Sequence, residues 1–410
     1  MDTRIQYRCE IQIQNNKKLW PKSICFMLVL MLLFPLFLSG DKVNLAVADE
    51  AQYYPGKGDN WETKKPEEVG MDPVLLEKAV AFAKVNGWTG PKDLAEAIKR
   101  SFGKEPFSSI TGPTKERGGT NGMIIRKGYI VAEWGDTKRV DMTFSVTKSY
   151  LSTTAGLALD HGLIEDVHDP VRIYVTDGKF DSEHNRKITW HHLLNQTSDW
   201  SGTLWDRPDW SDRPPKDVKW DDLRERELKE PGTSYKYNDV RVNLLAFSLL
   251  QVWRKPLPMV LREKIMDPIN ASSTWRWHGY NNSWVLLDGM KMQSVSGGGH
   301  WGGGMFISTR DQARFGLLFL RRGKWEDKQL LSEKWIDMLR VSTPANPSYG
   351  YMWWLNSEKR LPNVPESVYF AAGFGGNYIV VIDDYDMVVV VRWCGDLDGV
   401  IQRIIASVKE

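Results

Sequence analysis

Thr143-Phe144-Ser145-Val146-Thr147-Lys148-Ser149-Tyr150 opens an apolar run that ends at Gly162 and predicts a buried helix. A serine and a lysine three residues apart on a helix share one face, so the Lys148 amine can reach the Ser145 hydroxyl. A serine hydroxyl becomes a good nucleophile when a neighbouring group takes its proton. A lysine can do this where burial disfavours its charged form. The stretch therefore presents Ser145 as a candidate nucleophile and Lys148 as a candidate base.

The same spacing occurs a second time, at Ser101 and Lys104, so the pair alone is weak evidence. That copy contains Gly103 and lies in a polar stretch, which is typical of a surface turn. The residues after Ser145 are instead small and apolar. A lysine at the head of such a helix needs a reason to be there, because an isolated buried charge is costly.

The overall composition is that of an ordinary globular protein. The 410 residues are 42% hydrophobic and 26% charged, enough for one large domain or two merged lobes. The net charge of +2 gives no electrostatic footprint for nucleic acid. The 19 tryptophans are unusual, and we expect most of them to pack in the interior and a minority to line a cleft.

Residues 1–48 resemble a leader rather than part of the fold. An apolar run from Ile24 to Leu38 follows basic residues and precedes the cleavage candidate Ala46-Val47-Ala48. The run is short for a membrane span, and Pro35 interrupts it. We expect export to the periplasm or the exterior. The alternative is an uncleaved N-terminal anchor, which would tether the protein to a membrane.

The cysteines give no disulfide in the mature chain. Cys9 and Cys25 fall in the leader, which leaves Cys394 alone in an apolar, strand-like run. A small buried hydrophobic role is expected for it.

Residues 49–410 predict one α+β domain in which strands occur early and late and helices lie between. Helices are expected at 72–84, 93–102, 143–162, 189–194, from Tyr237 onward, at 309–320 and at 400–408. Strands are expected at 123–125, 129–134, 349–355, 378–382 and 387–393. This order suits an antiparallel sheet flanked by terminal helices, at about 65–142 and 345–410, beside a mostly helical lobe at about 143–344. Residues 88–119 look like a surface insertion.

Two further segments can complete an acyl-transfer site. In Pro231-Gly232-Thr233-Ser234-Tyr235-Lys236-Tyr237, a tight turn presents Tyr237 just before a helix, and a phenol near a lysine ammonium can pass protons. In Gly373-Phe374-Gly375-Gly376-Asn377, the glycines allow the backbone to approach a substrate closely. The backbone N–H groups of Ser145 and Phe374 could then hold an oxyanion. Taken alone, Tyr237 would be a packing residue and the glycines a strand entry.

These segments, together with Gly302-Gly303-Gly304-Met305 and Ser308-Thr309…Asp311, occur in the order found in one family. The chain resembles the serine β-lactamase-like hydrolases, which include class C β-lactamases, D-Ala-D-Ala peptidases, esterases and 6-aminohexanoate-dimer hydrolase. The resemblance covers most of residues 65–408. It implies an acyl-enzyme on Ser145, Lys148 as base or proton relay, and Tyr237 as proton carrier to the leaving group. No spaced Cys/His/carboxylate cluster occurs in the sequence, so no metal or cofactor is expected.

Two positions differ from the family pattern. The usual Tyr-x-Asn reads Tyr237-Asn238-Asp239, and a carboxylate cannot donate the hydrogen bond that an amide gives to an acylamide substrate. Asp239 can instead keep Lys148 charged, which favours Tyr237 as the base. The lysine of the third motif is replaced by Ala371, which removes a partner for a substrate carboxylate. Both differences point to an esterase or amidase on a small ester or amide.

Further substrate contacts are expected at Asp239, Gly373, Trp205 and His300. The alternatives left open are a D-Ala-D-Ala carboxypeptidase or β-lactamase, and a non-catalytic cell-wall-binding protein on the same fold.

Overall fold

The first and last strands of the chain build its largest sheet. A computed structural model describes residues 52–409, so the predicted leader lies outside the described residues. The sheet has seven strands, and every neighbouring pair is antiparallel. In spatial order they are β11 (Tyr349–Gly350), β12 (Trp353–Leu355), β13 (Tyr369–Gly373), β14 (Asn377–Ile382), β15 (Met387–Arg392), β1 (Asn121–Arg126) and β2 (Tyr129–Trp134). The central β15–β1 pair joins residues from opposite ends of the chain, with Asn121 opposite Arg392.

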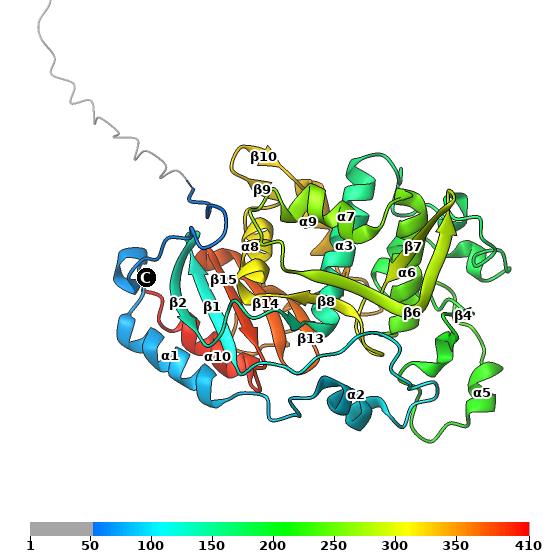
Figure 1. Ribbon diagram of the computed structural model, residues 1–410, viewed down its shortest axis with the longest axis horizontal. Coiled ribbons are helices and arrows are strands. Elements are labelled where there is room, and N and C mark those ends of the chain that lie inside the picture. Colours follow the sequence, from blue (N-terminus) through cyan, green and yellow to red (C-terminus); the bar gives the residue numbers. More distant parts are fainter. Residues whose placement is uncertain (1–51, 410) are drawn as a thin grey trace, which may run out of the picture. The chain divides into compact units, whose positions relative to one another are not determined.

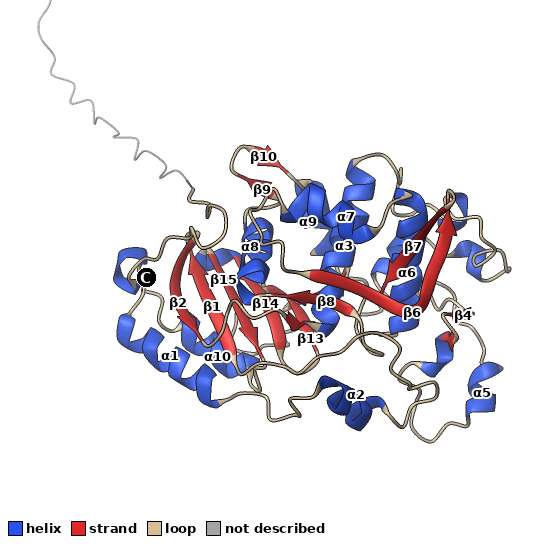
Figure 2. Cartoon of the chain, in the orientation of Figure 1, coloured by secondary structure: helices blue, strands red, loops and turns tan. Residues whose placement is uncertain are grey.

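Helices cover both faces of this sheet, as Figures 1 and 2 show. On one face α1 (Pro73–Val85) and α10 (Leu397–Ile405) pack together over Ile124 and Val389. On the other face α8 (Thr309–Leu320) packs on Ile125 and Val390. Adjacent strand residues thus enter different cores, as the two-residue period of a strand requires. The predicted sheet with terminal helices is confirmed.

The rest of the chain forms the helical part and a second, smaller sheet. This sheet runs β3 (Asp141–Met142), β8 (Gly304–Ile307), β6 (Arg276–Leu287) and β7 (Met290–Val295). Two short pairs are β4 (Thr203–Leu204) with β5 (Arg207–Pro208), and β9 (Lys324–Trp325) with β10 (Lys328–Gln329). The remaining helices are α2 (Leu94–Phe102), α3 (Thr147–Asp160), α4 (Trp190–Leu194), α5 (Trp220–Arg224), α6 (Asp239–Trp253), α7 (Leu257–Leu261) and α9 (Glu333–Leu339).

Local structure differs from the sequence prediction most clearly in two places. The single strand expected at 349–355 is two short strands, because Tyr351 and Met352 have φ of 37° and 68° and turn the chain back on itself. The glycine-rich segment after residue 280 contains the β6–β7 hairpin, which the glycine content concealed. Helix α8 has the expected bounds, and Ser308 caps it by accepting a hydrogen bond from the Asp311 N–H.

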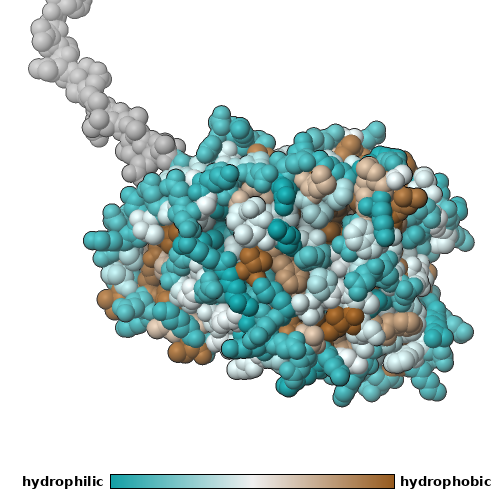
Figure 3. Space-filling view, in the orientation of Figure 1, coloured by the Kyte–Doolittle hydropathy of each residue, from teal (hydrophilic) through white to brown (hydrophobic). Residues whose placement is uncertain are grey.

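Helix α3 passes through the interior between the sheet and the helical part. Nearly all of its residues are buried, including Lys148. Cys394 is also buried and free, as expected. The face of the protein seen in Figure 3 is largely hydrophilic, with small separate hydrophobic groups. Within residues 52–409, no helix combines the length and apolar character needed to cross a bilayer.

Candidate active site

The candidate nucleophile lies on a tight turn at the start of α3. A short 3-10 helix, η2 (Phe144–Val146), precedes the helix, and Phe144 has a φ of 49°, an uncommon value for an aromatic residue. The Thr143 N–H donates to the Met305 carbonyl at 2.9 Å, which fixes this turn to β8. Backbone strain of this kind recurs beside functional groups.

Ser145 and Lys148 are in hydrogen-bond contact, as their spacing predicts. The Lys148 Nζ donates to Ser145 Oγ at 3.0 Å, and the lysine side chain is 1% exposed. The second Ser-x-x-Lys copy is different, because Ser101 and Lys104 are both exposed. Context therefore separates the two copies in the way that the surrounding residues indicated.

Asp239 compensates the charge of the buried lysine. Its Oδ1 accepts a short hydrogen bond from Lys148 Nζ, and its Oδ2 accepts one from Arg213 Nη2 at 3.0 Å. Burial disfavours the Lys148 ammonium, but Asp239 and Tyr237 together outweigh burial and raise the pKa of Lys148 above its usual value. Burial likewise opposes the Asp239 carboxylate, yet Lys148 and Arg213 hold its pKa well below the usual range. This supports a charged Lys148, the interpretation drawn from Asp239 in the sequence.

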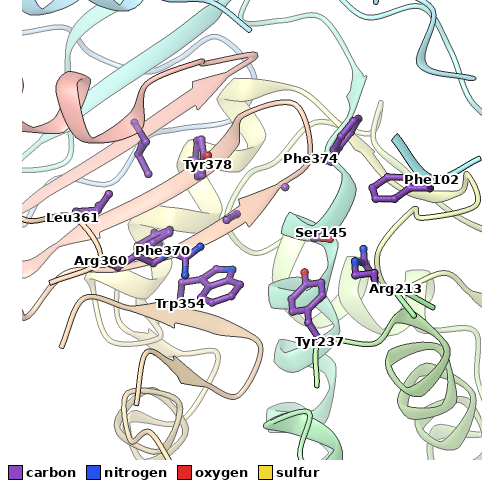
Figure 4. Close-up of a pocket in the computed structure, with 13 residues that line it drawn as sticks. Phe102, Ser145, Arg213, Tyr237, Trp354, Arg360, Leu361, Phe370, Phe374 and Tyr378 are labelled. Carbon is purple, nitrogen blue, oxygen red and sulfur yellow. The ribbon is translucent and has the colours of Figure 1, made fainter. Parts of the chain in front are cut away.

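Two cations lie over the ring of Tyr237 at the entrance to α6. Lys148 Nζ is 4.7 Å from the centre of its ring, and the Arg213 guanidinium carbon is 5.1 Å from it. Trp354 stacks on the ring with centroids 5.9 Å apart. Figure 4 shows the hydroxyl end of Tyr237 pointing toward Ser145. The serine, the lysine and the phenol therefore meet in one place.

A second layer of charged groups surrounds Asp239. Arg213 Nη1 donates to both Asp212 oxygens, at 2.6 and 2.8 Å, and the Asp239 N–H donates to Asp212. His300 Nε2 lies 2.9 Å from Glu105 Oε2, and its Nδ1 lies 3.5 Å from Asp239 Oδ2. Burial opposes the imidazolium, but these carboxylates outweigh burial and raise the pKa of His300. Three cationic groups thus face three carboxylates.

Three residues of this layer carry side chains that could act as ligands to a metal ion. Atoms of Glu105, Asp212 and His300 lie within 4.8 Å of one another. Arg213 already saturates the Asp212 carboxylate, and His300 pairs with Glu105. The donor set therefore fits the protein's own cations better than a metal ion. That the protein works without a metal or cofactor stays a prediction.

A cavity of about 320 Å³ opens in front of Ser145. Figure 4 shows it between the start of α3 and strand β13. Its wall is mainly aromatic and apolar and is formed by Phe102, Ser145, Arg213, Tyr237, Trp354, Arg360, Leu361, Phe370, Ala372, Gly373, Phe374, Tyr378 and Leu397. A volume of this size suits a small-molecule substrate.

Two glycines are required by close approach at the site. A Cβ at Gly373 would collide with the Thr143 carbonyl and lie 3.3 Å from Ser145 N, so β13 passes directly against the nucleophile turn. A Cβ at Gly298 would collide with Asp239 Oδ1 and Lys148 Nζ. Gly298 was not singled out in the sequence, although it belongs to the Gly297-Gly298-Gly299 run.

Of the residues expected to contact the substrate, some line the cavity and others do not. Gly373 and Phe374 line the cavity. Asp239 and His300 are buried and contact charged side chains, and they are not among the described residues that line the cavity. Trp205 packs edge-to-face on Phe247, with centroids 5.3 Å apart, and is not among the described residues that line the cavity.

Several residues of the site were not predicted from the sequence. Phe102 and Glu105 come from the segment interpreted as a surface insertion, which in fact reaches the cavity and His300. Arg213 comes from a polar, proline-rich loop, and Trp354 and Arg360 come from the region before β13. Only three-dimensional pairing identifies them, since none lies in a recognisable local pattern.

Comparison with known proteins identifies the class of protein that this fold and site define. The family model described as Beta-lactamase matches residues 113–394, and the chain belongs to that family. No curated protein matches the sequence.

Solved structures agree in fold at low sequence identity. A putative β-lactamase from Bacteroides dorei is 12% identical, with a TM-score of 0.56 over 82% of this chain and 99% of its own. A family VIII carboxylesterase is 17% identical, with a TM-score of 0.53 over 82% and 96%. A putative 6-aminohexanoate-dimer hydrolase from Bacillus anthracis is 15% identical, with a TM-score of 0.50 over 87% and 86%. Family and fold together indicate a hydrolase.

Proposed function

We propose that this protein is a serine hydrolase that cleaves a small ester or amide through a covalent acyl-enzyme on Ser145. The observation that carries the proposal is the convergence of three groups. Ser145 Oγ accepts a 3.0 Å hydrogen bond from buried Lys148, and the Tyr237 ring lies over the same lysine at the wall of the same cavity. Acyl transfer needs a nucleophile, a proton carrier and an electrostatic stabiliser in this arrangement.

In the proposed reaction Ser145 Oγ forms a bond to the substrate carbonyl carbon as its proton moves to the oxygen of Tyr237. In the same step Tyr237 gives its own hydroxyl proton to the departing oxygen or nitrogen, whose bond to the carbon breaks, so Tyr237 ends the step as a phenol. Water then hydrolyses the acyl-enzyme by the reverse proton path. Lys148 remains an ammonium, because Asp239 holds it charged, and it stabilises negative charge on the oxygens of Ser145 and Tyr237.

The backbone N–H groups of Ser145 and Phe374 are proposed to hold the oxyanion. Support comes from Gly373, whose close contact with the nucleophile turn brings the residue after it to the cavity beside Ser145. Two amide donors aimed at a developing oxyanion lower the barrier by several kcal/mol, roughly 3–4 for one donor.

The aspartate at position 239 supports an esterase or amidase rather than a β-lactamase or peptidase. Both of its oxygens are occupied by cations, and a carboxylate has no hydrogen to donate to an acylamide. The named activities of the similar carboxylesterase and 6-aminohexanoate-dimer hydrolase are in keeping with this choice. We further propose that the protein acts outside the cytoplasm, on the strength of the leader-like N-terminal sequence.

Turnover of 4-nitrophenyl butyrate tests the proposal. We expect the purified protein to release nitrophenol and Ser145→Ala to abolish the release. Ser101→Ala is the matched control, because it removes the serine of the exposed Ser-x-x-Lys copy and should leave turnover unchanged. Undiminished turnover by Ser145→Ala would refute the proposed nucleophile. A nitrocefin assay alongside should show little hydrolysis.

A further inference from the structure

One arginine at the cavity has no carboxylate partner among the described residues. Two arginines and no acidic residue line the cavity. Arg213 is paired with Asp212 and Asp239. Within residues 52–409 no carboxylate pairs with Arg360, whereas its neighbour Lys359 pairs with Glu366 at 3.4 Å. Arg360 is therefore the cation at this cavity that is free to meet a ligand.

Arg360 is an exposed side chain whose guanidinium lies over an aromatic ring. Its guanidinium carbon lies 4.1 Å from the centre of the Trp354 ring, and Trp354 in turn stacks on Tyr237. A guanidinium that lies over an aromatic ring can still direct its N–H groups to a carboxylate in a planar, two-pronged contact. Figure 4 shows Arg360 and Trp354 on the same side of the cavity, with Tyr237 between them and Arg213.

The wall around Arg360 is apolar. Leu361, Phe370 and Leu397 line the same cavity. A ligand that reached from Ser145 to Arg360 would thus pass apolar side chains before meeting a positive charge. Such a lining selects a reacting carbonyl joined to an anionic group through a short hydrocarbon spacer.

We propose that the substrate of the Ser145 site is an ester or amide that carries a carboxylate, and that Arg360, seated on Trp354, binds this carboxylate. The inference rests on the proposed hydrolase function. It also revises an expectation from the sequence, in which the replacement of the motif lysine by Ala371 left a substrate carboxylate without a partner. Arg360 supplies the cation from a different segment.

Two pairs of esters test this, each an acid and its methyl-capped neutral form. The mono-4-nitrophenyl ester of glutaric acid carries the carboxylate on the acyl part, and 4-carboxyphenyl acetate carries it on the leaving group. We expect kcat/KM to favour the acid in at least one pair, and the pair identifies the side on which the carboxylate sits. Arg360→Ala should lower that acid-to-capped ratio about tenfold or more, as loss of a charge-assisted contact implies.

Two further variants separate a specific contact from general attraction. Arg360→Lys keeps the charge but not the planar fork, and it should retain part of the preference. Lys359→Ala removes a neighbouring positive charge that does not line the cavity, and it should leave the ratio unchanged. No preference for either acid, or equal effects of Arg360→Ala and Lys359→Ala, would overturn the inference. Failure of the proposed function would give a different result, because Ser145→Ala would then hydrolyse both the free and the capped esters as fast as wild type does.

Discussion

Asp239→Asn is the most informative perturbation of the buried charge network. It restores the Tyr-x-Asn pattern of the family while removing the carboxylate that faces Lys148 and Arg213. The two side chains of the Lys148–Asp239 pair are each 1% exposed, so little solvent can replace the lost partner. Removing one member of a buried ion pair costs about 3–5 kcal/mol, and we expect a loss of that size in the free energy of unfolding.

Urea unfolding at pH 7, followed by tryptophan fluorescence, measures this cost. Asp337→Asn is the control, because it breaks an exposed pair with Arg322 and should cost at most about 1 kcal/mol. The Asp239 pKa is lowered in the folded state, so its contribution is present above its unfolded pKa of about 3.9 and is lost as pH falls toward the folded value. The gap between wild type and Asp239→Asn should therefore narrow below about pH 4. A cost no larger than that of Asp337→Asn would refute the assignment of Asp239 as the compensating charge.

Three further outcomes are expected. Gly298→Ala should lower kcat/KM for a nitrophenyl ester at least about tenfold, since a Cβ there collides with Lys148 and Asp239. Gly119→Ala is the control and should behave as wild type, because the space around its Cβ is open. Equal activities of these two variants would contradict the close contact at Gly298. His300→Gln should lower the free energy of unfolding most below about pH 6.5, the pKa of an unfolded histidine. The pKa of His300 is raised in the folded state, so its stabilising contribution is complete there and is lost as pH rises through the folded-state pKa. A difference in urea midpoint between wild type and His300→Gln that grew with rising pH would contradict this sign. Tyr237→Phe should lower kcat for the nitrophenyl ester about a hundredfold or more through loss of the proton carrier, and near wild-type turnover would exclude that role.

The parts of the fold that could be predicted from sequence are those with a local period. The β14–β15 hairpin and helices α1, α6 and α8 follow from apolar spacing and end signals. The Ser145–Lys148 contact follows from helical geometry alone. The split at Tyr351 and Met352 does not, because two aromatic or bulky residues at positive φ contradict their own preferences and only tertiary packing imposes them.

The charged surroundings of the site lie beyond such reasoning. Arg213, Glu105 and His300 are separated by long stretches of sequence, and each is an ordinary polar residue in its own segment. They act together only because the fold brings them around Asp239, in a buried region where an unpaired charge would be costly. Of the two departures from the family pattern, aspartate in place of asparagine at 239 was the available signal that such a network existed.

The central claim is that Ser145 forms a covalent intermediate. Incubation with a fluorophosphonate, followed by intact-mass measurement and peptide mapping, tests it directly. The predicted result is one adduct per chain, located on the peptide containing Ser145 and absent from Ser145→Ala. An unmodified protein, or an adduct that persists in Ser145→Ala, would contradict the account.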